Sequence, residues 1–428
     1  MQNVLTQKSP SLGVVIPHYI CGALFFVVLC FLILFSSDAF IGHYFHPKLL
    51  AITHIAALGW GTMIILGALY QLLPVILEVP LYSERLAKVT FITFTTGVIC
   101  LAWAFWNFYV SIHIQVAAIL LLLSFSLLVV NIVLTVNKAP KWTTEADFIV
   151  TSSVWLIFTG LLGALMAFNF TYPLLNKSHL LFLKIHAHMG IAGWFILLIM
   201  GVGSKLIPMF LLSHNLNTKK LTIAYYLVNI GLICFSADIF FREENAFLKL
   251  YALLIAAGIL FFMSFIYEAY KKRVRKQLDI GLKHSFMAFL FFLLPILLGI
   301  IMSFKPSLND KFMLQIYLVY GTSIFFGFIS SLILGQTFKT LPFIMWMHRN
   351  SKVAGKQKTL LPKDLYSPKL VKAQYVVYVI ALPTLVIGIL LSMPVIIKIG
   401  AMLLLVTAIL YTINVFKIVV PNFKPTNK

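Results

Sequence analysis

Three histidines lie in apolar parts of the sequence, close to lysines that we expect at a membrane boundary. His54 follows Lys48 by six residues. His186 and His188 follow Lys184 by two and four residues. At a rise of about 1.5 Å per residue, His54 lies ~9 Å inside that boundary. An ionisable group inside a membrane is costly, so each of these histidines is a candidate functional residue.

Imidazole chemistry indicates what these side chains could do. Neutral imidazole binds iron and copper well, so we predict His54, His186 and His188 as cofactor ligands, with His54 and His188 as candidates for heme iron. Residues two apart are separated by about 200° around a helix. His186 and His188 therefore serve two sites, or one binds while the other hydrogen-bonds. The alternative is that all three only bond to backbone carbonyls. The sequence names no catalytic residue.

The remaining histidines are expected near membrane boundaries, where an interfacial role explains them. His43 and His46 have a spacing that also suits a metal. The others are His18, His113, His179, His214, His284 and His348.

The elements that must position these histidines are membrane-spanning helices. Hydrophobic residues make up 61% of the chain and charged residues 11%, against about 25% charged in soluble domains. Charged residues are absent from 89–137, 148–176 and 284–304. A crossing helix needs about 20 apolar residues. We predict twelve spans near 17–37, 47–76, 87–108, 112–136, 148–170, 179–211, 222–241, 247–270, 283–303, 312–344, 371–393 and 395–418, with the second, sixth and tenth the longest.

The net charge of +21 reflects topology and does not indicate a nucleic-acid partner. Lys and Arg concentrate at the N-terminus, at the C-terminus and in alternate loops, above all in 271–276 and in the loop from Arg349 to Lys372. The positive-inside rule then places both termini in the cytoplasm. The first sixteen residues lack the pattern of a cleavable signal peptide. Four cysteines without paired spacing are expected to be packing residues.

A repeat with a constant period runs through the chain. The separation between Pro74 and Pro208 equals the separation between Pro208 and Pro342. Two sets of glycines follow the same period, and His54 aligns with His188 and with Thr322. The glycine sets are Gly59, Gly193 and Gly327, and Gly67, Gly201 and Gly335.

This period predicts one transmembrane domain, 1–428, built from three four-helix units near 13–146, 147–280 and 281–428. An even number of helices gives each unit the same orientation, so we expect a pseudo-threefold bundle. The fold class is therefore all-α integral membrane. We expect the glycines to allow close helix packing and the three prolines to end or kink their helices.

The segments from His54 to Trp60 and from His188 to Trp194 resemble the second-helix heme-ligand region of subunit I in the heme-copper oxidase and nitric oxide reductase superfamily. The chain also resembles smaller relatives of that superfamily, including the NnrS family of nitric-oxide-response membrane proteins. The resemblance covers nearly the whole chain. It implies twelve helices in three arcs, cytoplasmic termini and histidine ligands in the outer half of the membrane.

The ligand set of that superfamily is incomplete in this chain. Residues 312–344 contain no histidine where the superfamily has a His-x-His pair, and 222–241 lacks the adjacent His-His pair for copper. The sixth-helix motif that carries a cross-linked tyrosine is not recognisable. A complete heme–copper centre therefore does not transfer. The pair His186 and His188 could be an altered ligand set, with His54 as a partner across the bundle axis.

The resemblance implies a heme-binding membrane protein, such as a subunit I-like cytochrome c oxidase or nitric oxide reductase, that transfers electrons or binds or reduces a diatomic gas, O₂ or nitric oxide. Heme is the expected cofactor and copper a second one. The expected partners are the lipid bilayer, respiratory or electron-donor subunits and the gas. The expected location is the bacterial inner membrane. The alternative is a non-redox transporter, assembly factor or structural subunit of a respiratory complex on the same scaffold.

Overall fold

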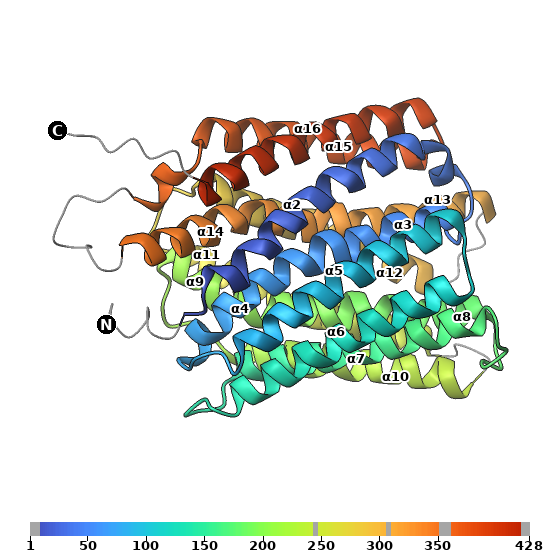
Figure 1. Cartoon of the computed structure of the whole chain (residues 1–428), viewed down its shortest axis with the longest axis horizontal. Coiled ribbons are helices and arrows are strands. Elements are labelled where there is room, and N and C mark those ends of the chain that lie inside the picture. Colours follow the sequence, from blue (N-terminus) through green and yellow to red (C-terminus); the bar gives the residue numbers. More distant parts are fainter. Residues whose placement is uncertain (1–8, 243–246, 305–309, 351–360, 421–428) are drawn as a thin grey trace. The chain divides into compact units, whose positions relative to one another are not determined.

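A computed structural model describes residues 9–242, 247–304, 310–350 and 361–420, and these residues form helices without strands (Figure 1). Twelve of the helices are long and apolar enough to cross a membrane. This confirms the predicted all-α membrane class, and the twelve apolar helices make the chain an integral membrane protein. Lys305, the two terminal segments 1–8 and 421–428, and much of the basic loop between Arg349 and Lys372 lie outside the described residues.

The observed spans match the predicted ones to within about five residues at each end. The second, sixth and tenth spans are the longest, with 31, 33 and 40 residues, which confirms that prediction. In order, the helices are α2 (Leu12–Phe35), η1 (Ser37–Ile41), α3 (Pro47–His54), η2 (Ile55–Thr62), α4 (Met63–Leu77), α5 (Glu84–Asn107), α6 (Ile112–Val136), α7 (Thr144–Asn169), α8 (His179–His188), η3 (Met189–Ile196), α9 (Leu197–Leu211), α10 (Lys219–Phe241), α11 (Leu248–Lys271), α12 (Ile280–Ser303), α13 (Asp310–Thr322), η4 (Ser323–Ser330), α14 (Ser331–Asn350), η5 (Pro362–Leu365), α15 (Pro368–Leu390) and α16 (Pro394–Val419).

Short polar side chains and prolines set where several helices begin. The hydroxyl of Ser83 accepts a hydrogen bond from the Leu86 amide at 3.2 Å, and Thr143 caps α7 in the same way. Such caps satisfy amides that have no partner within the helix. Helices α3, α15 and α16 each carry proline in their first turn, where its missing N–H costs nothing.

Each of the three long helices contains an eight-residue π-helical segment. These segments, η2, η3 and η4, begin at Ile55, Met189 and Ser323, so their starts are equally spaced along the chain. A π-helical turn widens the helix and frees a backbone carbonyl, and it is often found at functional sites. The spacing of the starts is that of Pro74, Pro208 and Pro342, so the same local irregularity recurs at the period of the sequence repeat.

Glycines of the long helices contact the first helix of each repeat at matching positions. An added Cβ would lie 2.5–2.7 Å from the Cβ atom of the neighbouring residue, so only glycine permits this approach, as predicted. The contacts join Gly67 to His18, Gly201 to Phe148 and Gly335 to His284. Matched contacts at the repeat period support the repeat, while the pseudo-threefold arrangement stays a prediction.

The repeated prolines do not end their helices. Pro74, Pro208 and Pro342 lie inside α4, α9 and α14. The first two helices continue for three residues beyond the proline and α14 for eight. A proline close to a helix end removes a single backbone hydrogen bond, and a membrane helix tolerates this where neighbouring groups bond to the freed carbonyl.

The chain divides into two compact units. Unit 1 comprises Met1–Val75, Leu278–Pro295 and Leu308–Lys428, and unit 2 comprises Ile76–Gln277 and Ile296–Ser307. In unit 1, α16 packs against both α15 and α2. In unit 2, α6 lies between α5 and α7, and α10 pairs with α11. These units are defined by contacts, whereas the three predicted repeat units are defined by sequence period and stay a prediction.

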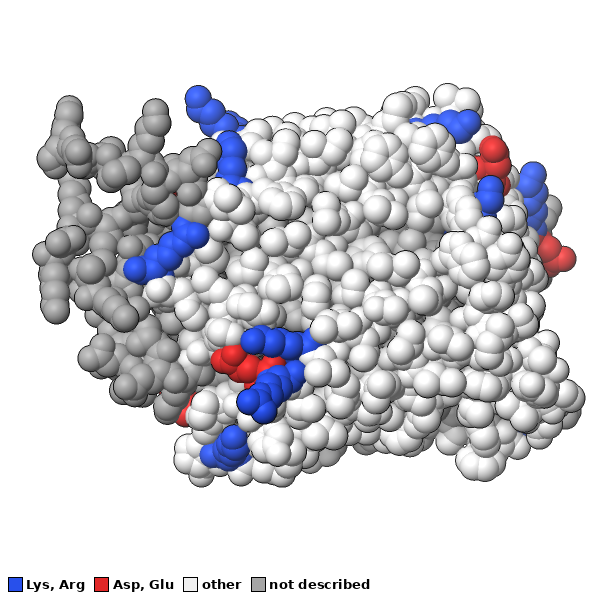
Figure 2. All heavy atoms as spheres, viewed as in Figure 1, with Lys and Arg blue, Asp and Glu red and all other residues white. Residues whose placement is uncertain are grey.

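Charged side chains avoid the middle of the helices. On the face that Figure 2 shows, Lys, Arg, Asp and Glu lie towards the helix ends, and the surface between them is uncharged. Large apolar side chains such as Ile92, Trp103 and Leu290 are exposed on the protein. A surface of this kind suits the hydrocarbon of a bilayer, because charged groups are costly at that depth.

Candidate functional site

His54 is the last residue of α3 and immediately precedes η2. Its Nδ1 atom lies 2.7 Å from the backbone carbonyl oxygen of Leu50, four residues earlier. A carbonyl can only accept, so Nδ1 carries the proton and donates it. The Nε2 atom then holds the lone pair with which a neutral imidazole binds a metal. The ring is only partly buried.

His188 repeats this geometry in unit 2. It is the last residue of α8 and immediately precedes η3. Its Nδ1 atom lies 2.8 Å from the carbonyl oxygen of Lys184, again four residues earlier. Its ring centroid lies 5.1 Å from that of Phe235 on α10. The two histidines thus share a position in the repeat, a tautomer and a place at the start of a π-helical segment.

These features suit metal ligation. In metal sites, a ligating histidine usually donates its second ring N–H to a carboxylate, a carbonyl or water, which fixes the ring and its tautomer. The carbonyls of Leu50 and Lys184 supply this bond to His54 and His188. Within the described residues, no group of three or more His, Cys, Asp or Glu side chains gathers to hold an ion.

His186 differs from its neighbour His188. Its Nδ1 atom lies 3.0 Å from the carbonyl oxygen of Thr159 on α7. A Cβ atom added to Gly163 would lie 2.8 Å from the Cε1 atom of His186, so the ring rests directly on the α7 backbone. His186 therefore faces α7 while His188 faces α10, which confirms that the two side chains point in different directions. The contacts of His186 are those of a link between two helices.

Most of the other histidines make local contacts. His43 and His46 accept hydrogen bonds from the nearby amides of Phe45 and Lys48, so each holds its own turn. His113 is exposed. Its ring lies 5.3 Å from that of Trp103. These contacts agree with the interfacial role expected for them.

The side chains of His18 and His284, near the starts of α2 and α12, are completely buried within the protein. Their expected place at the membrane boundary stays a prediction. The reason for the burial is the close approach of Gly67 and Gly335, which brings a neighbouring helix over each imidazole. The alignment of these glycines in the repeat could have indicated this burial.

Sequence reasoning also missed polar side chains that join the long helices of unit 1. The indole Nε1 of Trp60 in η2 donates to the hydroxyl of Ser330 in η4 at 2.9 Å. The hydroxyl of Tyr378 on α15 donates to the backbone carbonyl of Phe326, and that carbonyl lies within η4. The first bond joins two side chains, and the second brings a hydroxyl to a backbone carbonyl inside a π-helical segment, where carbonyls can lie outside the normal helical ladder.

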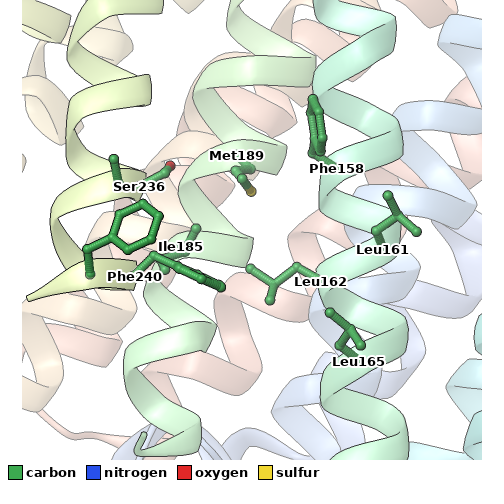
Figure 3. A pocket seen from close by; sticks show the side chains of 10 residues that line it. Phe158, Leu161, Leu162, Leu165, Ile185, Met189, Ser236 and Phe240 are labelled. Atoms are coloured by element: carbon green, nitrogen blue, oxygen red, sulfur yellow. The ribbon is translucent and has the colours of Figure 1, made fainter. Parts of the chain in front are cut away.

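An apolar hollow of about 290 Å³ lies beside α8 in unit 2. Figure 3 shows Phe158, Leu161 and Leu165 of α7 on one side of it, with Met189 on the other. The remaining lining residues are Leu162, Ile185, Ser236, Ala237, Phe240 and Phe241. Because many of these side chains are exposed, the hollow suits hydrocarbon chains of lipid better than a polar substrate.

Comparison with known proteins does not identify a family for this chain. No family model matches the chain, and no curated protein matches it. The arrangement at His54 and His188 therefore carries the functional argument.

Proposed function

We propose that this chain is a heme-binding membrane protein similar to subunit I of the heme-copper oxidase superfamily, in which His54 and His188 are ligands of heme iron. The observation that carries the proposal is the shared position of the two imidazoles, because each residue directly precedes a π-helical segment. Each Nδ1 also donates to the carbonyl four residues earlier, but His18 makes the same bond to Val14, so this bond by itself does not identify a ligand.

The residues fit the chemistry of such a group. A neutral imidazole with a fixed Nδ1 proton offers Nε2 to iron, and the carbonyl bond raises its basicity. Heme bound by two histidines would carry electrons, whereas heme bound by one would leave a position for O₂ or nitric oxide. The protein's own contribution is to hold the imidazoles neutral and correctly oriented among apolar helices.

The proposal gives the three candidate histidines different roles. His54 and His188 each bind heme iron. His186 holds α8 against α7 through Thr159 and Gly163, and this role replaces direct cofactor contact in the proposal. Copper is a secondary candidate, because no third ligand joins either imidazole among the described side chains.

The cellular setting belongs to the same proposal. The basic run 271–276 and the positive-inside rule support cytoplasmic termini. A bacterial inner membrane would provide electron-donor subunits of a respiratory chain. Activity as an oxidase or nitric oxide reductase would require such a donor, so we propose an oxidoreductase role only in that context.

Absorption spectroscopy tests the proposal. Protein expressed with ample heme and purified in detergent is expected to show a Soret band, and metal analysis is expected to find iron. The His54→Ala and His188→Ala variants are expected to lose the band or change its spin state. His113→Ala is the matched control, because this exposed histidine lies outside the candidate site.

A protein without bound heme, and without spectral change in either variant, would contradict the proposal. Uptake of a solute into proteoliposomes by such heme-free protein would instead support the non-redox transporter. Purification within a larger cytochrome complex, unaffected by both substitutions, would support a structural subunit.

A further inference from the structure

Three polar side chains on α12, α14 and α15 of unit 1 have buried atoms that lack hydrogen-bond partners among the described residues. Both ring nitrogens of His284 lack one among the described residues. The same holds for both amide atoms of Gln374 and for the Oε1 atom of Gln336. His284 and Gln374 have no exposed surface. Buried polar groups are almost always satisfied, and ordered water is a common partner.

The contacts of His284 bring these groups to one region. Gly335 on α14 lies against the Cβ atom of His284, and the imidazole turns to α15. Its ring centroid lies 4.8 Å from that of Tyr375 and 5.9 Å from that of Tyr378. Gln374 is adjacent to Tyr375 and one helical turn before Tyr378, so its amide belongs to the same part of α15.

Gln336 connects this region to α12. Its amide nitrogen donates to the hydroxyl of Ser285 at 2.7 Å, the residue next to His284. Its Oε1 atom remains unpartnered among the described residues. Lys339, three residues further along α14, forms an ion pair with Asp279 just before α12. The unpartnered groups therefore lie close to a charged pair at the end of these helices.

The geometry points to an internal water-binding site between α12, α14 and α15, with His284, Gln336 and Gln374 as its ligands. The unpartnered set mixes donors and acceptors. A neutral imidazole offers one of each, the Gln374 amide offers both, and the Gln336 oxygen accepts. A metal ion accepts only lone pairs, whereas water both donates and accepts. Because a buried water makes about three hydrogen bonds, the five atoms need about two waters.

Radiolytic labelling in water enriched with ¹⁸O tests this site. Short X-ray exposure makes hydroxyl radicals from bound water, which oxidise the nearest side chains. Tyr378 is expected to take up several-fold more label than Tyr411, although neither side chain is exposed. Tyr411 is the matched control, because it is equally buried but its ring packs against Phe26, Trp60 and Phe338, whereas the ring of Tyr378 packs against His284. Equal labelling of the two tyrosines would overturn the inference.

Substitution separates this site from the proposed heme site. The His284→Phe and Gln374→Leu variants remove polar ligands and are expected to lower the labelling of Tyr378 to the level of Tyr411. If a variant fails to fold, the labelling of Tyr378 and Tyr411 in the unmodified protein still tests the water site. The Soret band is expected to stay unchanged in both variants. A changed band in His284→Phe would assign the imidazole to a cofactor and overturn the water site.

Discussion

At His54 and His188, the carbonyl four residues earlier determines which ring nitrogen carries the proton. The residue type was readable from the sequence, because an imidazole within an apolar run is unusual, whereas its depth in the membrane stays a prediction. The tautomer was not readable from the sequence, since it depends on the hydrogen bond from Nδ1 to a backbone carbonyl of the folded helix. The contact of His186 was not readable either, because only the fold shows that its ring packs against Gly163 of α7.

Gly163→Ala is expected to destabilise the protein by about 1–3 kcal/mol, because the new methyl group would overlap the His186 ring. Thermal unfolding in detergent measures the effect. Gly321→Ala is the matched control, since an added Cβ there would meet nothing within 4 Å. That control is expected to raise stability by up to about 1 kcal/mol, as helix propensity predicts. Equal effects of the two substitutions would contradict the contact.

At the scale of elements, the three π-helical segments are a feature that the sequence did not predict. The aligned residues Gly59, Gly193 and Gly327 lie within these segments, but they indicated only close helix packing. Hydropathy cannot distinguish a π-helical turn from an α-helical one, because both carry the same apolar residues. The side chains that bond to these segments come from helices distant in sequence. One example is the Tyr378 hydroxyl, which donates to the Phe326 carbonyl. Spans were predictable because a bilayer fixes their length and composition.

The bond between Trp60 and Ser330 is expected to couple η2 to η4. Trp60→Phe retains the stacking on Phe26, whose ring lies 4.3 Å away, but loses the indole donor. We expect a loss of ~1–3 kcal/mol for Trp60→Phe and ~1 kcal/mol for Ser330→Ala. The double variant is expected to cost less than the sum, because both changes remove one bond. Strict additivity in denaturant unfolding would contradict the coupling.

At the scale of the whole molecule, the number of spans and the distribution of basic residues predict the topology. An even number of spans predicts both termini on one side, and the positive-inside rule predicts that this side is cytoplasmic. The constant period of the repeat predicts three similarly oriented four-helix units. The matched contacts of Gly67, Gly201 and Gly335 agree with this period, whereas the pseudo-threefold arrangement stays a prediction.

Cysteine labelling tests the topology. Asn137 and Leu174 are exposed residues in the loops before and after α7. In a background without the four native cysteines, an impermeant maleimide added to intact cells is expected to label Leu174→Cys and to leave Asn137→Cys unlabelled. Labelling of both after cell disruption provides the control. The reverse pattern in intact cells would place the termini outside.

The central claim is that the imidazoles of His54 and His188 bind heme iron, and chemical rescue tests it most directly. His54→Gly and His188→Gly remove the ring and leave space for a free imidazole. The account predicts that each variant loses or shifts the Soret band and that added imidazole restores it. Wild-type spectra in both glycine variants, before any imidazole is added, would contradict the claim.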